Sequence, residues 1–253
     1  MKNRSCPLKR QLFFSSMLMD FRCKQFSLNH SASTMKVGTD SILLATLAPE
    51  ANPKNILDVG TGCGIISLVM AQRFSSAAIT AIDLDFNSVR QASENFNLSK
   101  WNDRLTALNI SFQDFATNKD NCHKYDYIVS NPPFFVNSLN SPYCKRNLAR
   151  HTSTLSFEEF AFCVSKVCTD DARIICILPP EQNGLLSDCL SVYSLYAIER
   201  INIYTCYDKP LERIISVFAH SQSQIIVRDF YIRDIDNNYT EQYLRTVETV
   251  LFV

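Results

Sequence analysis

The stretch "NILDVGTGCGIIS" (residues 55–67) decides how the chain folds. It runs from an apolar segment of the buried-strand type, through three alternating glycines (Gly60, Gly62 and Gly64), into the apolar start of a helix. A strand, a tight turn and a helix form the first unit of an alternating α/β fold. Glycines also let the backbone approach a ligand closely, so this turn is a candidate binding site.

Strand-like and helix-like segments continue to alternate on either side of this unit. The alternation predicts an α/β fold with a seven-stranded, mostly parallel sheet and helices on both of its faces. Two late strands, residues 195–206 and 213–220, follow each other without a helix between them, which predicts a hairpin and one antiparallel strand. The expected strands are residues 55–60, 77–85, 104–110, 125–130, 172–179, 195–206 and 213–220, the expected helices are residues 38–48, 64–74, 86–98, 156–168 and 184–193, and the tail holds a further strand (225–232) and a short helix (239–251).

The composition narrows the class of protein. The chain has 253 residues, and its 25 basic and 25 acidic side chains give a formal net charge of zero. The overall charge therefore does not favour nucleic acid, and any nucleic-acid site must be a local basic patch. Its 10 cysteines form no C-x-x-C pair, which indicates reduced thiols in a cytoplasmic protein and neither a disulfide scaffold nor a zinc site. The four histidines are isolated from other ligand residues, so no metal is expected. No apolar run reaches the ~18 residues of a membrane helix.

The domain organisation is expected to be simple. Residues 1–18 are interpreted as disordered, or as an upstream start that does not belong to the fold. Residues 19–253 are expected to form one domain, with a β-rich and helical lead segment (19–50) before a catalytic core (51–253). We find no internal repeat or low-complexity linker, and a monomer is the simplest expectation.

The spacing of the glycine turn excludes two common ligands. A dinucleotide site requires G-x-G-x-x-G, and position 65 is Ile; a phosphate loop requires a G-K-[ST] ending that is absent. Asp58, just before the turn, would repel a phosphate and attract a ligand that carries an ammonium group.

Two further acids follow the next expected strands, where ligands bind in such sheets. Asp83 is placed to accept hydrogen bonds from both hydroxyl groups of a ribose. Asp114 is placed to accept a hydrogen bond from an adenine amino group. Together with Asp58 they suggest a ligand that has an ammonium group, a ribose and an adenine. S-adenosylmethionine has all three. Each has a plainer interpretation: Asp83 as the N-cap of the helix that starts at Phe86, and Asp114 as a surface turn residue.

The fourth of these strands ends in "NPPF", residues Asn131, Pro132, Pro133 and Phe134. The prolines fix the backbone and leave their carbonyl oxygens free to accept. The Asn131 side chain and the Pro132 carbonyl could then hold an amine that is to be methylated, and Phe134 could stack on a base flipped out of its helix or loop. The alternative is that Asn-Pro-Pro only ends a strand.

These motifs resemble those of the class I amino-methyltransferases, which have a Rossmann-like sandwich fold. The lead "FRCKQFSLNHSASTMKVGTDSILL" and the segment "CKRNLARHTSTLSFEEF" are similar to the bacterial family that methylates adenine N6 in the anticodon loop of valine tRNA. The resemblance implies tRNA as partner and S-adenosylmethionine as cofactor. It places Asp58, the glycines, Asp83 and Asp114 at the cofactor and residues 131–134 at the reaction.

Two segments are candidates for further contacts. Thr39 lies where the lead could cover the cofactor, although Thr39 and Asp40 could equally form only a helix N-cap. Basic residues that could bind tRNA phosphates lie after the catalytic loop and in the lead, and each could instead be a solvated surface residue: Lys145, Arg146, Arg150, His151 and Lys36.

Two other functions use the same motifs. One is methylation of a glutamine amide in a release factor, against which the short lead argues, because a peptide-recognising relative would carry a helical domain there. The other is a non-catalytic subunit that binds the cofactor, against which the intact "NPPF" argues.

Overall fold

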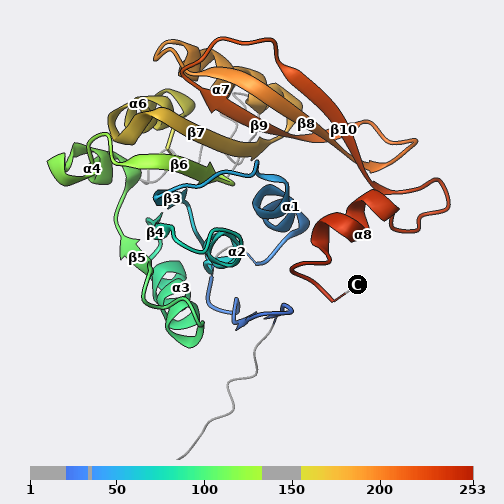
Figure 1. Cartoon of the computed structure of the whole chain (residues 1–253), viewed down its shortest axis with the longest axis horizontal. Coiled ribbons are helices and arrows are strands. Elements are labelled where there is room, and N and C mark those ends of the chain that lie inside the picture. The colour runs from blue at the N-terminus through green and yellow to red at the C-terminus, as the bar shows by residue number, and fades with distance from the viewer. Residues whose placement is uncertain (1–20, 34–35, 133–154, 253) are drawn as a thin grey trace, which may run out of the picture.

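A single eight-stranded sheet forms the centre of the computed structural model, which describes residues 21–33, 36–132 and 155–252 (Figure 1). Its strand order is β10-β8-β9-β7-β6-β3-β4-β5, so the chain starts in the middle of the sheet, builds one edge and then returns to build the other. The strands are β3 (Asn55–Val59), β4 (Ala78–Asp83), β5 (Leu105–Asn109), β6 (Tyr125–Ser130), β7 (Cys168–Leu178), β8 (Tyr196–Cys206), β9 (Leu211–Ala219) and β10 (Ile226–Arg233).

Strand direction confirms the predicted fold class. β9 pairs antiparallel with β7 and β8, and the other neighbouring pairs are parallel. The sheet has eight strands, one more than the predicted seven, because the tail strand β10 adds in parallel to β8, from Ile226 opposite Glu199 to Arg233 opposite Cys206. Local sequence shows that this segment is extended but not which strand it joins, since a parallel neighbour is reached only through a long connection.

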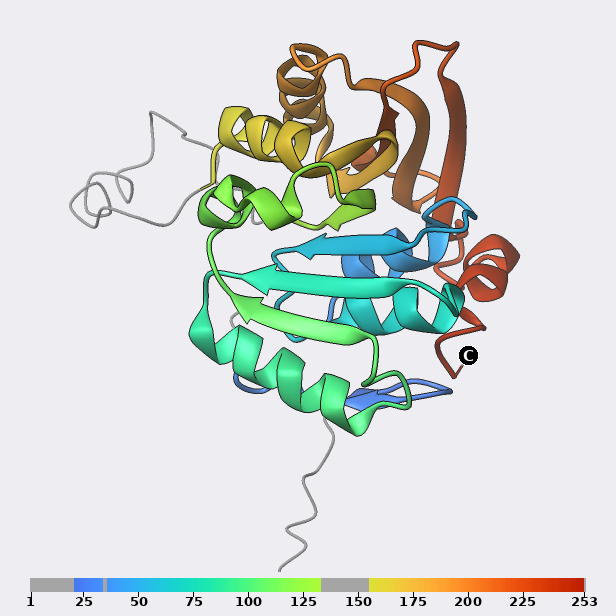
Figure 2. The ribbon, with the colours of Figure 1, turned by 60° about the vertical axis from the view of Figure 1, so that its left-hand side comes forward.

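Helices cover both faces of the sheet (Figures 1 and 2). One hydrophobic core lies under α1 (Thr39–Leu47), α2 (Ile65–Arg73), α3 (Phe86–Leu98) and α8 (Glu241–Val247), and the other lies under α4 (Phe112–Thr117), α6 (Phe157–Val167) and α7 (Pro180–Ser191). Both cores share the same strands: in β3, Ile56 packs in the first and Leu57 in the second. This alternation follows from the period of two in a strand, and it turns Asp58 toward the face that carries α2.

The lead segment folds onto α3 and the glycine turn. The lead segment contains β1 (Phe21–Arg22) and β2 (Ser27–Leu28), which form a small antiparallel pair. The Asn95 side chain then joins three parts of the chain: its Oδ1 accepts from the Asn29 N–H at 2.9 Å, and its Nδ2 donates to the Asn29 and Cys63 carbonyl oxygens, both at 2.8 Å. Residues 1–18, expected to be disordered, lie outside the described residues.

Element boundaries differ from expectation at a few positions. β7 begins at Cys168, four residues early, and α7 begins at Pro180, where a proline needs no N–H partner. α6 begins as predicted with a capping box between Ser156 and Glu159. The six-residue α4 was not predicted, because so short a segment shows no helical period. Within the described ranges, no helix combines the length and apolar character needed to cross a bilayer.

Candidate active site

The carboxyl ends of β6, β3, β4 and β5 bring the predicted site residues to one edge of the sheet. These four strands are parallel neighbours in that order. Figure 2 shows β3, β4 and β5 as blue to green arrows that point the same way. Asp58, Asp83 and Asn131, separated by up to 73 positions in the sequence, therefore end at the same edge.

Asp58 is fully buried beneath the first turn of α2. Its Oδ2 accepts hydrogen bonds from Thr61 Oγ1 at 2.7 Å and Ser67 Oγ at 2.6 Å. Its Oδ1 is buried without a hydrogen-bond partner in the described residues. Burial raises the pKa of this carboxyl to about 6, and the two hydroxyl groups offset part of that rise. A buried carboxylate with one unpaired oxygen is suited to a cationic ligand group.

The glycine turn has a different requirement at each end. Gly60 has a φ of +76°, and a Cβ there would meet no atom of the described residues within 4 Å, so the space beside it is open in this part of the structure. Gly64 has a φ of +87°, and a Cβ there would lie 2.5 Å from the Phe96 ring. Gly60 therefore leaves room for a ligand, whereas Gly64 allows α2 and α3 to pack closely.

Asp83 connects the end of β4 to the glycine turn. Its Oδ2 accepts from the Gly62 N–H and its Oδ1 from the Asp85 N–H, both at 2.9 Å, and burial raises its pKa. The interpretation of Asp83 as the N-cap of α3 is wrong, because Asp85 is the N-cap: its side chain accepts from the Ser88 N–H and hydroxyl, both at 2.8 Å.

Asp114 lies in the first turn of α4, just after β5. It is exposed, its Oδ2 accepts from Ser111 Oγ at 2.7 Å, and its N–H donates to that oxygen at 3.0 Å. It is thus a helix residue rather than a turn residue, at the strand end where the sequence placed it.

Asn131 presents a buried acceptor just after β6. The residue is only 9% exposed, and its Nδ2 donates to Ser41 Oγ of α1 at 3.2 Å. Its Oδ1 is buried without a partner among the described side chains. Pro132 is partly buried and ends its described segment. Pro133 and Phe134, together with Lys145, Arg146, Arg150 and His151, lie outside the described residues.

A cavity of about 400 Å³ opens beside Asn131, and sequence reasoning missed most of its wall. Lys36 and Thr39, both predicted site residues, line it. The rest of the wall comes from the start of α1, from β8, β9 and β10, and from α8 and the loop before it, which no local motif connects to Asn131: Gly38, Asp40, Ser41, Ile203, Thr205, Glu212, Arg213, Ile232, Arg233, Tyr239 and Tyr243.

The first turn of α1 faces this cavity without a side-chain cap. Its N-cap is Gly38, so the interpretation of Thr39 and Asp40 as an N-cap is wrong. Thr39 is exposed, and Asp40 forms an ion pair with Arg213, with 2.9 Å between Oδ2 and Nε. The Ser41 hydroxyl orients Asn131. α1 thus contributes three consecutive side chains to the site.

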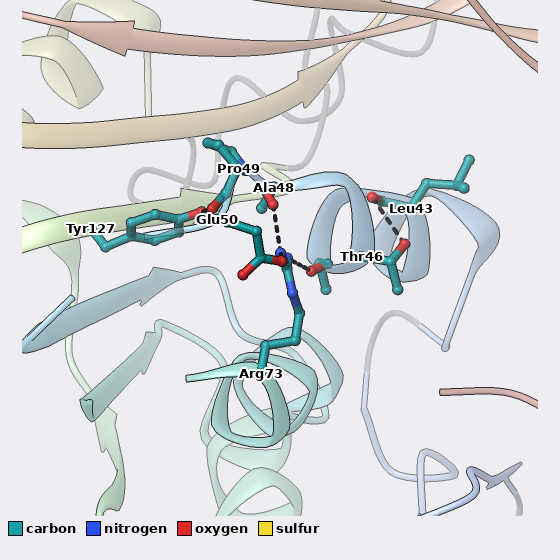
Figure 3. A network of polar contacts seen from close by, with 8 residues as sticks. Leu43, Thr46, Ala48, Pro49, Glu50, Arg73 and Tyr127 are labelled. Carbon is teal, nitrogen blue, oxygen red and sulfur yellow. Dashed lines mark hydrogen bonds and ion pairs between the residues drawn. The ribbon is translucent and has the colours of Figure 1, made fainter. Parts of the chain in front are cut away.

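The other end of α1 is fixed by Arg73 at the end of α2 (Figure 3). The guanidinium donates to the Ala45 carbonyl at 2.6 Å and the Ala48 carbonyl at 2.8 Å, and it pairs with Glu50 at 2.6 Å. The Tyr127 hydroxyl of β6 donates to the Pro49 carbonyl at 2.8 Å. These contacts satisfy carbonyl groups at the end of α1 and tie the helix to α2 and to the strand that carries Asn131.

Metal binding and covalent catalysis would require ligand clusters and reactive nucleophiles. In the described part of the chain, no group of three or more His, Cys, Asp or Glu side chains could hold a metal ion. Cys63 lies in the glycine turn, and burial raises its pKa to about 11, so its thiol is protonated at neutral pH.

Comparisons with known proteins identify the family of the chain. The family model of the methyltransferase small domain matches residues 28–155. A tRNA1(Val) (adenine(37)-N6)-methyltransferase from Bacteroides fragilis is 33% identical over 225 residues, which are 89% of this chain and 94% of that protein. A protein of the same name from Glaesserella parasuis is 36% identical over 228 residues, covering 90% and 95%.

Solved structures show the same fold at much lower identity. A predicted O-methyltransferase from Agrobacterium tumefaciens aligns with a TM-score of 0.67 at 14% identity, over 85% of this chain and 98% of that one. A ribosomal protein L11 methylase from Lactobacillus delbrueckii aligns with a TM-score of 0.54 at 16% identity, over 77% and 84%. From the match across nearly the whole length of the curated relatives, the chain belongs to the tRNA1(Val) (adenine(37)-N6)-methyltransferase family.

Proposed function

We propose that this protein transfers a methyl group from S-adenosylmethionine to N6 of an adenosine in tRNA, namely adenosine 37 in the anticodon loop of a valine tRNA, as the names of its relatives state. The observation that carries the proposal is the Oδ1 of Asn131, which is buried without a partner among the described residues on a side chain that lines the cavity of about 400 Å³. We propose the cytoplasm as its location and a monomer as its active form.

The part of the site around Asp58 and the glycine turn fits S-adenosylmethionine. This cofactor would supply an electrophilic methyl group on a sulfonium. The unpaired Oδ1 of Asp58 suits the ammonium group of this ligand, and the open space at Gly60 allows close approach. In the proposal Asp83 binds the ribose hydroxyls, Asp114 binds the adenine amino group, and Gly62, Gly64 and Thr39 complete the site.

The part of the site around Asn131 and Pro132 would bind and orient the amine that receives the methyl group. Asn131 Oδ1 and the Pro132 carbonyl oxygen each accept one N–H of the adenine N6 group. An exocyclic amine is a weak nucleophile, because its lone pair is delocalised into the ring. Two acceptors fixed by the protein favour a pyramidal nitrogen whose lone pair is directed at the methyl group, so catalysis rests on positioning and electrostatics. The product ammonium is acidic and loses its proton to water.

The remaining predicted contacts concern the RNA itself. In the proposal Phe134 stacks on the flipped adenine, with Pro133 fixing the turn before it. The proposal also assigns RNA phosphate contacts to Lys145, Arg146, Arg150, His151 and Lys36. Lys36 lines the cavity.

A labelled-cofactor assay tests the function directly. The protein is incubated with methyl-labelled S-adenosylmethionine and either an unmodified valine tRNA transcript or a purified release factor. Label that digests to N6-methyladenosine is expected, and its loss when adenosine 37 is replaced by guanosine fixes the position. Label in the release factor instead would show that the acceptor is a glutamine amide, and no label in either would show a non-catalytic subunit.

A further inference from the structure

Two arginines line the Asn131 cavity, and they differ in how their charge is balanced. Arg213 is paired with Asp40 and lies 3.9 Å from the Glu212 carboxylate. Arg233, at the end of β10, has no carboxylate of the described residues within ion-pair distance. The chain has a net charge of zero, so an arginine whose charge is not balanced by a nearby carboxylate is a favourable place for an anion to bind. Arg233 is such an arginine, and it lines the same cavity as Asn131.

Arg233 is also held in place before any ligand arrives. One guanidinium nitrogen donates to the Asn237 carbonyl oxygen at 2.7 Å, and the guanidinium carbon lies 4.1 Å from the centre of the Tyr239 ring. Tyr239 in turn stacks on Tyr243, with 4.7 Å between ring centres and 16° between ring planes. A guanidinium fixed by a ring and a carbonyl loses less conformational entropy on binding than a free side chain does.

Two further features of the cavity suit an extended anionic ligand. The first turn of α1 contributes Gly38, Thr39 and Asp40 to the wall, and its N–H groups have no side-chain cap. The nine-tenths buried Asn131 lies in the same wall, and its Oδ1 has no partner among the described residues. The cavity thus offers an acceptor for an amine together with a helix N-terminus and a fixed cation, the combination that a nucleotide chain requires.

We propose that Arg233 binds a backbone phosphate of the RNA next to the methylated adenosine, and that Tyr239 positions the guanidinium for this contact. The proposal rests on the proposed function and adds the residues that hold the RNA. Arg233, Tyr239 and Tyr243 lie beyond residues 28–155, which the general methyltransferase domain matches, as expected of residues that serve the acceptor rather than the methyl donor.

The test compares Arg233→Gln with Arg228→Gln on the same strand. Arg228 pairs with Glu199 at 2.8 Å, and five residues of strand place it about 16 Å from Arg233. Binding of an unmodified valine anticodon stem-loop is measured over a series of salt concentrations. We expect Arg233→Gln to weaken binding roughly tenfold and to lower the salt slope by about 0.7 to 0.9. Arg228→Gln should change neither quantity.

Steady-state kinetics separates phosphate binding from a general structural effect. For Arg233→Gln, KM for tRNA should rise while kcat and the dissociation constant of S-adenosylmethionine stay within about twofold of the wild-type values. Tyr239→Phe, which keeps the ring, should bind RNA like the wild type, whereas Tyr239→Leu should weaken binding in the same way as Arg233→Gln.

The outcomes separate this proposal from the function on which it rests. If the wild type transfers no label to tRNA, the proposed function fails. If the wild type methylates tRNA but Arg233→Gln retains full RNA affinity and salt slope, the role of Arg233 is refuted. Equal losses in Arg233→Gln and Arg228→Gln would also refute it, because net charge alone would then account for binding.

Discussion

A single oxygen atom of Asn131 carries most of the proposed chemistry. The amide is oriented by the Ser41 hydroxyl on its nitrogen side, and Oδ1 is buried without a partner in the described part of the chain, so it can accept from an N–H group of the substrate. A buried acceptor without a partner is costly in the free protein, so its presence at a strand end beside a cavity is expected of a functional group.

Replacing Asn131 should therefore slow methyl transfer strongly while leaving the fold intact. We expect Asn131→Ala to lower kcat by about 100-fold or more, because removal of one fixed hydrogen-bonding group at a reaction centre typically costs this much. Ser41→Ala should cause a smaller loss, since Oδ1 remains. Single-turnover rates measure both effects, and calorimetry should show donor binding unchanged. An Asn131→Ala protein with the wild-type rate would remove Asn131 from the mechanism.

Asp58 links donor binding to pH. Its pKa is raised to about 6 by burial, above the unfolded value of 3.8, so the folded protein binds the extra proton. Stability contributed by the protonated form is therefore lost as pH rises from about 4 to about 6. Ionisation of this buried carboxyl destabilises the free protein by an amount on the order of 3 kcal/mol.

Asp58→Asn should thus be at least as stable as the wild type at neutral pH and bind S-adenosylmethionine more than tenfold less tightly. In the wild type, donor affinity should fall as pH drops below about 6, when Asp58 is protonated. Urea unfolding and calorimetry across this pH range measure both quantities. A pH-independent donor affinity in the wild type would show that the Asp58 carboxylate does not contact the donor.

At the scale of single elements, the glycine turn separates ligand binding from packing. Gly60→Ala should lower donor affinity, because its Cβ enters open space at the site, and should lower stability by the ~1–2 kcal/mol of a left-handed alanine. Gly64→Ala should lower stability by about 2–5 kcal/mol, because its Cβ also collides with Phe96. Gly184→Ala in α7, where nothing lies within 4 Å, is the control and should be neutral or stabilising.

The contacts of Arg73 at the end of α1 make a second prediction at this scale. Arg73→Met leaves the Ala45 and Ala48 carbonyls without their donor and should cost about 2–4 kcal/mol of unfolding free energy. Arg90→Met removes only the exposed pair with Glu94 and should change stability by less than about 0.5 kcal/mol. Urea denaturation measures both; equal effects would mean that the α1 contacts add nothing beyond surface charge.

The elements also show how far sequence could predict the site. The carboxyl ends of parallel strands meet at one edge, so Asp58, Asp83 and Asn131 could be placed together from local patterns alone. Asp85 rather than Asp83 proved to be the cap, because two acids two residues apart fit the same pattern and only the register of α3 separates them. Local patterns could not predict which distant residues join Asn131 in the cavity wall. The positions of Arg213, Arg233 and Tyr239 depend on how β8, β9 and β10 pair.

For the molecule as a whole, one sheet shared by two cores predicts one unfolding transition. Ile56 and Leu57 of β3 pack on opposite faces, so neither layer of helices can be lost without exposing the same strand. We expect a single calorimetric transition that S-adenosylmethionine at 100 times its dissociation constant shifts upward by roughly 5–10 °C. Two transitions, or a shift of only part of one, would show that residues 19–253 are not a single domain.

The order of the strands also constrains how the chain can be made. β3 to β6 emerge from the ribosome before β7 exists, and until then β6 leaves the backbone groups of Tyr127, Ile128 and Val129 unpaired along an apolar edge. A nascent chain halted at this stage would hold most of the donor site yet tend to aggregate through that edge. The second half of the polypeptide is therefore needed to close this edge, because β7 supplies the backbone partners of β6.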